Sequence, residues 1–387
     1  MNSYRVAILG CRGRGTAAAR AYHEHPQTEI VGLCDLVAEL RDSLGEELGV
    51  DARYEDLDRM IESTEPDIVV IATGTEFHYD LAMRVLEHGV NIDVEKPLCT
   101  DLEEADAVIA KAREKSARIA VHHRGRTGGA MLAVKKAIAE GKIGSLRYLH
   151  GSGKGYYGAY GLMNIGTHML NNMMGIAGHC RSVGAVVLTD GKPIVPGDVL
   201  NAAGGMGVVV GEQITAALDF SDGVTGTLVQ HRFPKVDSAA YCLEIFGTEG
   251  RLLWKTTGAW WLPTPHFVAD GEENKWQPLE ILMPESFSAN GQASEADYWY
   301  ADDFVRALDE GREHECNGPE GLHVMEIMMG IFESGAYGRR VELPQTERNH
   351  PLLRWLREGD MEPPGPLPRP YGEWLAAEDE RLGRSGS

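Results

Sequence analysis

The sequence predicts an α/β protein in which a doubly wound parallel sheet is followed by a second α/β domain with an open, mostly antiparallel sheet. Short apolar runs alternate with helical segments over residues 1–124, after which strands joined by tight turns dominate. The chain has 387 residues, too many for one ordinary core and about right for two domains. We therefore expect a first domain at 1–124, a second at 125–340 and a Pro-rich C-terminal arm at 341–387.

The predicted elements of the first domain alternate between strand and helix. Apolar runs bounded by glycine or charged residues predict strands at 4–9, 29–34, 67–73, 90–95 and 118–123. The intervening segments predict helices at 14–24, 37–48, 55–62, 77–88 and 102–115. Gly89 suits the end of one helix, and Thr100 or Asp101 can cap the start of another. Strands connected through helices run parallel, so this sheet is doubly wound.

Strands dominate the second domain. Helices are predicted at 129–140, 165–175, 295–310 and 318–335, and a glycine-rich loop or bent strand at 197–211. Strands are predicted at 213–220, 224–233, 241–247 and 251–256. Ile214, Ala216, Leu218 and Phe220 share one face of the first of these strands, which indicates a sheet covered on one side. The uncovered side predicts a homodimer or homotetramer, because large apolar patches are rarely left in water.

The composition limits the class of partner and the compartment. The chain has 37 Lys and Arg against 58 Asp and Glu, a formal charge of −21, which argues against nucleic acid and anionic membrane surfaces as partners. No apolar run approaches the roughly 20 residues of a membrane span, and we see no signal peptide. The 6 cysteines are scattered without a CxxC pair, so we expect a cytoplasmic protein with reduced thiols. No spacing predicts a metal site.

A glycine-rich turn follows the first strand. Residues 10–15 read GCRGRG, in which Gly10, Gly13 and Gly15 let the backbone turn sharply and approach a pyrophosphate at the start of a helix. Asp35 ends the second strand, where a carboxylate accepts hydrogen bonds from the adenosine ribose hydroxyls and repels a 2′-phosphate. The sequence therefore predicts a dinucleotide site that takes NAD rather than NADP.

Two arginines complicate this turn. Arg12 stands where the usual G-x-G-x-x-G pattern has glycine, and Arg14 follows two residues later. The two side chains either help to hold the pyrophosphate or extend into solvent, and the sequence favours neither. An arginine here could also tolerate a 2′-phosphate, which weighs slightly against the preference for NAD.

A second motif, Glu95-Lys96-Pro97, lies at the carboxyl end of a predicted parallel strand. Ligands of open α/β sheets bind at that edge, and a lysine there can hydrogen-bond a substrate hydroxyl and transfer its proton. Glu95 could partner the lysine, and Pro97 fixes the chain direction. An isolated motif of this kind would more often be a solvated strand end.

The motif is not isolated. A series of motifs along the chain resembles the Gfo/Idh/MocA oxidoreductases. In order, these motifs are GCRGRG, Asp35, IATGTEFH (71–78), Glu95-Lys96-Pro97, Gly166-Thr167-His168 and FGTEGRL (246–252). The resemblance runs from about residue 4 to about 340. It implies an NAD-binding Rossmann domain, a substrate-binding and oligomerisation domain with an open sheet, and hydride transfer between a carbohydrate carbon and the nicotinamide.

The same resemblance implies roles for individual residues. Lys96 corresponds to the family's catalytic lysine and His168 to its catalytic histidine. The implied contacts to the cofactor come from Gly10, Arg12, Gly13, Arg14, Gly15, Asp35, Thr73, His78, Glu95 and Lys96. Asn164 and Asn171 stand where the family usually has acids beside the histidine, and asparagine cannot take a proton at neutral pH. Lys96 is therefore the expected acid/base for the oxidised hydroxyl, with His168 binding or relaying.

Further polar and aromatic residues suggest a cationic, aromatic substrate pocket. With the two asparagines, the candidate substrate contacts are His122, His123, Arg124, Lys154, Tyr156, Tyr157, Asn164, Asn171 and His231. Such a pocket suits a sugar that carries a carboxylate, sulfonate or phosphate.

Three functions remain open from the sequence. The leading hypothesis is an NAD-dependent dehydrogenase acting on a sugar or polyol. The second is an NAD-dependent glycosidase that works by transient oxidation, elimination, water addition and re-reduction. The third, a non-catalytic NAD-binding regulator, is the least favoured because Lys96 and His168 are both present.

Overall fold

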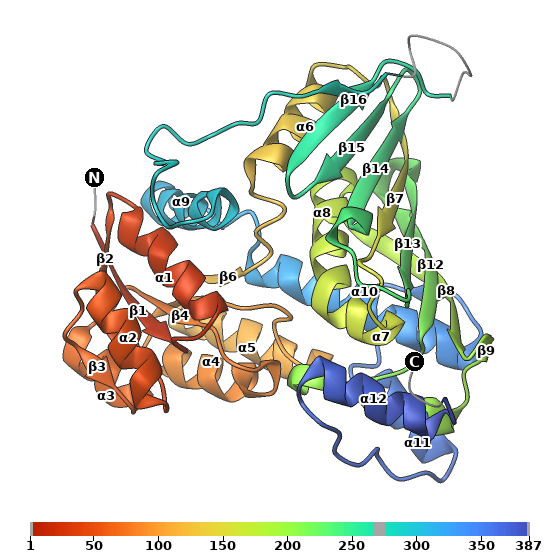
Figure 1. Cartoon of the computed structure of the whole chain (residues 1–387), viewed down its shortest axis with the longest axis horizontal. Coiled ribbons are helices and arrows are strands. Elements are labelled where there is room, and N and C mark those ends of the chain that lie inside the picture. Colours follow the sequence, from red (N-terminus) through yellow and green to blue (C-terminus); the bar gives the residue numbers. More distant parts are fainter. Residues whose placement is uncertain (1–2, 267–274, 385–387) are drawn as a thin grey trace. The chain divides into compact units, whose positions relative to one another are not determined.

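The chain folds as two compact units (Figure 1). This computed structural model describes residues 3–266 and 275–384. Unit 1 comprises Met1–Cys99, Glu104–Gly129 and Leu282–Leu322, and unit 2 comprises Thr100–Glu103, Ala130–Ile281 and His323–Ser387. The sequence assigned 282–322 to the second domain, because no change in composition marks its return to the first.

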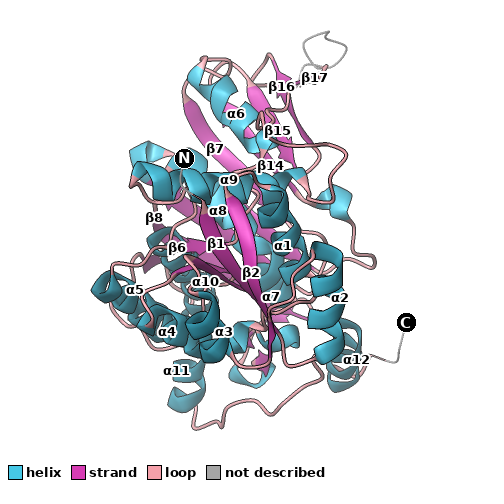
Figure 2. Cartoon of the chain, turned by 90° about the vertical axis from the view of Figure 1, so that its left-hand side faces the viewer, coloured by secondary structure: helices cyan, strands magenta, loops and turns pink. Residues whose placement is uncertain are grey.

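Unit 1 is built on a six-stranded parallel sheet of order β3-β2-β1-β4-β5-β6, which confirms the doubly wound prediction. Its strands are β1 (Tyr4–Leu9), β2 (Thr28–Cys34), β3 (Arg53–Tyr54), β4 (Ile68–Ile71), β5 (Asn91–Val94) and β6 (Ile119–Val121). The connecting helices are α1 (Arg14–Glu24), α2 (Ala38–Leu48), α3 (Leu57–Thr64), α4 (His78–Glu87) and α5 (Leu102–Lys115). Figure 2 shows β1 and β2 flanked by helices. The central strands are buried on both faces, as the continuous run Ile68–Ile71 indicates.

The segment 282–322 completes unit 1. Helix α9 (Glu295–Glu310) begins at Ser294, whose hydroxyl accepts the Asp297 N–H, and its aromatic residues join the core around α1. Further on, the Cys316 carbonyl accepts the Val121 N–H at 2.8 Å, so this stretch pairs with the edge strand β6. This contact covers part of the outer edge of the sheet, which reduces the backbone that β6 offers to another chain.

Unit 2 contains a ten-stranded mixed sheet, mostly antiparallel as predicted. The main path is β17-β16-β15-β14-β7-β13-β12-β8-β18, and β9 pairs with β8. These strands are β7 (Leu146–Ser152), β8 (Cys180–Thr189), β9 (Lys192–Pro193), β12 (Gln213–Phe220), β13 (Thr225–His231), β14 (Cys242–Gly247), β15 (Arg251–Lys255), β16 (Gly258–Leu262), β17 (Gln277–Pro278) and β18 (Val341–Glu342). A separate ladder joins β10 (Leu200–Asn201) to β11 (Val208–Val209), inside the predicted glycine-rich stretch.

One face of this sheet is covered by helix α8 (Thr167–Ala177). The alternation in β12 is as predicted, with Ile214 and Phe220 fully buried. A Cβ on Gly151 or Gly226 would run into methionines of α8, so glycines allow the helix to lie close to the strands. Other helices of the unit are α6 (Gly129–Ala139) and α10 (Gly318–Tyr337), which begins in unit 1.

The segment expected as a C-terminal arm contains two further helices, α11 (Pro351–Glu358) and α12 (Tyr371–Arg381). Trp374 of α12 is fully buried and donates from Nε1 to the Asn201 carbonyl at 2.7 Å. Arg232 at the end of β13 donates to both carboxylate oxygens of Asp379, at 2.6 and 2.8 Å. The Pro-rich and charged composition of 341–387 did not predict these helices. They attach to the rest of the unit through a few side chains, and composition does not mark such contacts. Within the described residues, no helix is long and apolar enough to cross a membrane.

Candidate functional site

Two positions of the glycine-rich turn after β1, Gly10 and Gly15, are packed too closely for a side chain. Gly10 has a φ of +94°, and a Cβ there would collide with the Ala72 carbonyl oxygen. A Cβ on Gly15 would collide with the carbonyl of Gly10. Gly13, with a φ of +48°, is exposed and has open space beside it. The turn therefore brings bare backbone to the start of α1, the arrangement that accepts a pyrophosphate.

Asp35 lies against this turn at the end of β2. Its Oδ2 accepts the Cys11 N–H at 2.8 Å, and its Oδ1 accepts the Val37 N–H at 2.9 Å. Each carboxylate oxygen has two lone pairs, so both retain capacity for a ribose diol. Asp35 itself is partly exposed, so a ligand can reach the carboxylate. The residues of the turn and Asp35 together fit an NAD.

The two arginines of the turn have different environments. Arg12 is exposed. Arg14 donates from Nε to Glu95 Oε1 at 3.0 Å and from Nη2 to Asp297 Oδ1 at 2.6 Å. The structure therefore commits Arg14 to two carboxylates of unit 1, while Arg12 remains available to a phosphate.

Those contacts belong to a set of charged side chains at the carboxyl edge of the sheet, in which four buried groups meet two partly exposed arginines. This edge cluster consists of Arg14, Asp93, Glu95, His122, Arg124 and Asp297. His122 Nδ1 lies 3.1 Å from Asp93 Oδ1, and its Nε2 lies 3.2 Å from Asp297 Oδ1. Arg124 donates to the other oxygen of Asp297 at 2.9 Å, and the Tyr22 hydroxyl donates to Asp93 at 3.0 Å.

Protonation in the edge cluster follows from these contacts. Burial opposes charge on the His122 ring, but Asp93, Glu95 and Asp297 outweigh it and raise the pKa of His122 to about 9. Burial alone would raise the pKa of Asp297, yet His122, Arg124 and Arg14 hold it well below its ordinary value. The pKa of Glu95 is likewise lowered by His122, Arg14 and Lys96 against the effect of burial. At neutral pH His122 is therefore charged, and Glu95 and Asp297 are ionised.

Sequence reasoning missed Asp93 and Asp297. A signal for Asp93 was present, since a carboxylate inside the buried run VNIDVE requires a partner. For Asp297 no local signal exists, because its position one turn into a helix is typical of ordinary capping. His122 and Arg124, taken as substrate contacts from the sequence, lie in this cluster with the cofactor candidates Arg14 and Glu95.

Lys96 follows Glu95 directly and is partly exposed. The next peptide bond, to Pro97, is cis. The Pro97 carbonyl lies 2.9 Å from Nδ1 of the fully buried His78, whose Nε2 lies 3.3 Å from the Thr73 carbonyl. Burial lowers the pKa of His78. His78 therefore links the turn after β5 to the turn after β4, which carries Thr73.

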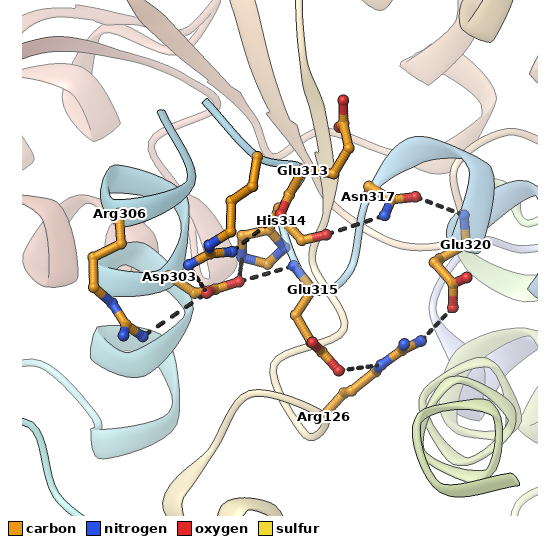
Figure 3. Close-up of a pocket in the computed structure, with 9 residues that line it drawn as sticks. Arg126, Asp303, Arg306, Glu313, His314, Glu315, Asn317 and Glu320 are labelled. Atoms are coloured by element: carbon orange, nitrogen blue, oxygen red, sulfur yellow. Dashed lines mark hydrogen bonds and ion pairs between the residues drawn. The ribbon is translucent and has the colours of Figure 1, made fainter. Parts of the chain in front are cut away.

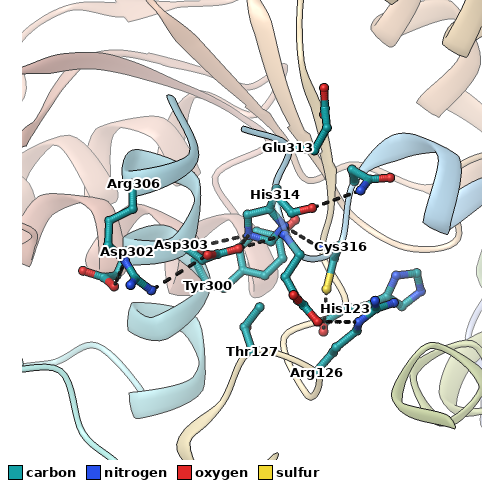
Figure 4. A network of polar contacts seen from close by, with 12 residues as sticks. His123, Arg126, Thr127, Tyr300, Asp302, Asp303, Arg306, Glu313, His314 and Cys316 are labelled. Carbon is teal, nitrogen blue, oxygen red and sulfur yellow. Dashed lines mark hydrogen bonds and ion pairs between the residues drawn. The ribbon is translucent and has the colours of Figure 1, made fainter. Parts of the chain in front are cut away.

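His123 is almost fully buried, in contrast to a substrate-facing position. Burial, Lys96, Arg126 and His122 together hold its pKa well below the ordinary value. Its carbonyl accepts the Cys316 Sγ–H at 3.5 Å, in the network drawn in Figure 4. The His123 ring is therefore uncharged and belongs to the core of unit 1.

His168 of unit 2 lies just after a distorted helical turn. One continuous helical segment comprises α7 (Gly158–Gly161), the π-helical turn η2 (Leu162–Gly166) and α8, on which His168 is partly exposed. Asn164 within η2 donates to the Tyr160 hydroxyl at 3.2 Å, and Asn171 is fully buried. Single π-turns inside α-helices occur frequently at functional sites. The helix predicted at 165–175 is therefore longer than expected.

The remaining substrate candidates of unit 2 do not form one group. Tyr157 is fully buried, and its hydroxyl donates to Glu378 at 2.9 Å. The ring of Tyr156 lies 5.1 Å from that of Tyr371, and Lys154 Nζ lies 5.3 Å from the Tyr241 ring centroid. His231 contacts Thr215 at 2.9 Å, on the sheet face opposite α8. The structure therefore does not bring His231 together with His168.

Unit 1 also has a pocket lined by charged residues outside the edge cluster, shown in Figure 3. Arg126 contacts Glu315 at 3.0 Å and also Glu320, and Arg312 contacts Asp303 at 2.7 Å. Because the arginines of this pocket already have carboxylate partners, it offers no free positive charge to an anionic ligand. Among the residues that the structure describes, no cluster of three or more His, Cys, Asp or Glu side chains could hold a metal ion.

Comparison with known proteins matches both halves of the chain to one family. Residues 4–123 match the model of an oxidoreductase family with an NAD-binding Rossmann fold, and residues 131–253 match the model of its C-terminal domain. D-apiose dehydrogenase of Paraburkholderia graminis is 24% identical over 92% of this chain and 94% of that protein. Levoglucosan dehydrogenase of Pseudarthrobacter phenanthrenivorans is 24% identical over 89% of this chain and 99% of that protein.

Solved structures agree on the fold. A levoglucosan dehydrogenase in complex with NADH and levoglucosan superposes with a TM-score of 0.72 at 21% identity, covering 89% of this chain and 100% of the other. An oxidoreductase from Agrobacterium radiobacter, in complex with NAD+, L-tartaric acid and magnesium, gives 0.71 at 20% identity and covers 88% and 98%. With the glycine-rich turn, Asp35 and the Glu95-Lys96-Pro97 motif in place, the chain belongs to the Gfo/Idh/MocA family and is an NAD-dependent oxidoreductase.

Proposed function

We propose that the enzyme is a dehydrogenase that oxidises a hydroxyl-bearing carbon of a sugar or polyol. The observation that carries this proposal is the position of Lys96, at the carboxyl end of β5 and one residue from Glu95, which Arg14 ties to the glycine-rich turn. Relatives that match nearly the whole chain are dehydrogenases of D-apiose and levoglucosan, which supports a carbohydrate substrate. They do not favour a redox-neutral glycosidase.

The cofactor preference follows from Asp35. NAD, when bound, supplies the acceptor for the hydride. The Asp35 carboxylate is fixed by the two backbone N–H groups of Cys11 and Val37, so it is oriented before the ribose arrives. A 2′-phosphate would bring negative charge against it, and NAD is therefore preferred.

In the proposed reaction Lys96 takes the proton of the hydroxyl that is oxidised. General acid–base groups of this kind contribute typically about 10²–10⁴-fold. His168 holds the same hydroxyl or relays its proton. Asn164 and the partly exposed Tyr156 and Lys154 are the proposed further substrate contacts of unit 2.

The proposed substrate carries no strong negative charge. His122 and Arg124, which the sequence assigned to a cationic pocket, contact Asp297 instead. Tyr157 and Asn171 are fully buried and support their helix rather than contact a ligand. A neutral sugar or polyol therefore fits the remaining candidates better than a sugar acid or phosphate.

The proposed assembly is a homodimer or homotetramer in a reducing, cytoplasmic environment. The sheet face opposite α8 includes Val186, which is 60% exposed, beside the exposed Thr215 and Ala217. A second copy is the proposed cover for this face. All 6 cysteines are free thiols, which supports a reducing compartment.

Cofactor preference is tested at Asp35. We expect the wild type to bind NAD more tightly than NADP, and Asp35→Asn to weaken NAD binding by about tenfold, because a charged acceptor of the ribose hydroxyls is lost. Isothermal titration calorimetry with both cofactors measures this. The exposed Asp42→Asn is the matched control and should leave both affinities unchanged. Tighter binding of NADP by the wild type would remove Asp35 from the cofactor site.

The chemistry is tested at Lys96 and His168. We expect Lys96→Met to slow single-turnover reduction of bound NAD by about 10²-fold or more with little change in NAD affinity, because the proton acceptor is lost. We expect His168→Ala to weaken sugar binding and turnover together. Absorbance of the reduced nicotinamide follows the step. Lys115→Met, which removes a surface ion pair with Glu87, is the control. If Lys96→Met reduced NAD at the wild-type rate, Lys96 would not be the proton acceptor, and His168 or Tyr156 would be the next candidates.

Assembly is tested at Val186. We expect light scattering at micromolar concentration to give a dimer or tetramer, and Val186→Glu to shift it toward smaller species because charge enters an apolar contact. Val195→Glu is the control, since Val195 is 56% exposed but lies outside the sheet strands. A monomeric wild type would exclude the proposed assembly.

A further inference from the structure

We propose that Asp297 of α9 is a positioning residue for hydride transfer. Acting through Arg14, it holds the glycine-rich turn and Lys96 in a fixed position relative to each other. The expected change in the rate of hydride transfer rests on the proposed dehydrogenase function, whereas the expected change in NAD affinity does not. Asp297 comes from a segment that returns to unit 1 long after the cofactor motifs.

Asp297 is held rigidly. Its side chain is 2% exposed, and it accepts from Arg14 at 2.6 Å, from Arg124 at 2.9 Å and from the Ser294 hydroxyl at 2.5 Å. Its backbone N–H donates in return to the Ser294 hydroxyl at 3.2 Å. Its position is therefore set by the start of α9, and the carboxylate has little freedom to follow a moving partner.

Arg14 transmits this position to both functional motifs. It is the first residue of α1, so its backbone is part of the glycine-rich turn. Its guanidinium lies between Asp297 and Glu95, with Nη2 on the first and Nε on the second. The guanidinium is planar, so two fixed carboxylates leave it one orientation. Glu95 in turn is covalently joined to Lys96, and the contacts run without a gap from α9 to the lysine.

The charge count gives Asp297 an effect at Lys96 as well. The edge cluster has three anions against three cations when His122 is protonated. Replacing Asp297 with asparagine keeps the shape but removes one of these anions, which leaves Arg14 and Arg124 with less compensating negative charge beside Glu95, the neighbour of Lys96. A loss of orientation and a loss of compensating charge both act on the reacting end of the site, whereas the sugar contacts proposed in unit 2 are untouched.

A purely structural role predicts something different. If Asp297 only fixes α9 to the sheet, its loss lowers thermal stability but leaves NAD affinity and the rate of hydride transfer at wild-type values. Asp302 is a suitable comparison, because it lies on the same helix, is 14% exposed and pairs with Arg306 at 2.9 Å outside the edge cluster.

The experiment uses the full-length variants Asp297→Asn, Arg14→Met, the double variant and Asp302→Asn. For Asp297→Asn we expect the Kd for NAD, measured by calorimetry, to rise about tenfold and single-turnover NAD reduction to slow about tenfold, with the KM for the sugar unchanged. The double variant should be no worse than Arg14→Met alone, because both changes cut the same link. Asp302→Asn should match the wild type in NAD affinity, in the rate of NAD reduction and in the KM for the sugar.

Three results would overturn the proposal: wild-type NAD affinity and rate in Asp297→Asn, effects that add in the double variant, or an equal effect of Asp302→Asn. If Asp297→Asn does not fold, Arg14→Met still tests whether Arg14 links the turn to Lys96, and wild-type NAD affinity and rate in that variant would overturn the proposal. If the wild type oxidises no sugar, the proposed function fails, while the NAD affinities still decide whether Asp297 acts through Arg14.

Discussion

The edge of the parallel sheet depends on a balance of buried charge. Asp93, Glu95 and Asp297 face Arg14, Arg124 and His122, and none of the three carboxylates is more than 9% exposed. A buried ion pair adds little net stability relative to apolar groups, but breaking one typically costs about 3–5 kcal/mol because a charge is left uncompensated. The edge cluster connects the start of α1 to the ends of β5 and β6 and to α9, at the edge where ligands of this fold bind.

The residues proposed to act in catalysis are divided between the two units. Unit 1 supplies the glycine-rich turn, Asp35 and Lys96, all positioned by backbone contacts or by the edge cluster. Unit 2 supplies His168 on a helix with a π-turn, where the usual acids are replaced by asparagines. Asn164 and Asn171 carry amides, which cannot take a proton at neutral pH, and this supports the proposal that Lys96 transfers the proton.

Local signals account for what the sequence predicted. The strands at 4–9 and 213–220 and the helix at 295–310 agree with β1, β12 and α9, because periodicity and caps are encoded within each segment. The contacts that the sequence did not predict join residues that are far apart along the chain. Asp297 meets Arg14 across 283 positions and Arg232 meets Asp379 across 147, and no local pattern marks either contact. His231 was grouped with the site by its place at a strand end, yet the pleat turns it to the opposite face.

The protonation of His122 tests the charge balance most directly. Its pKa is raised from 6.5 to about 9, so its charged form stabilises unit 1 fully below pH 6.5, and that contribution is lost as the pH rises through 9. Arg14 Nη2 also lies 3.1 Å from His122 Nε2, a contact that would be a hydrogen bond only if the ring were neutral. Nitrogen-15 NMR of the histidine rings, with His122 assigned by its loss in His122→Asn, distinguishes the two states. The balanced cluster predicts a ring protonated on both nitrogens at pH 7 that titrates near pH 9. A single neutral tautomer at pH 7, with Nε2 accepting from Arg14, would contradict it.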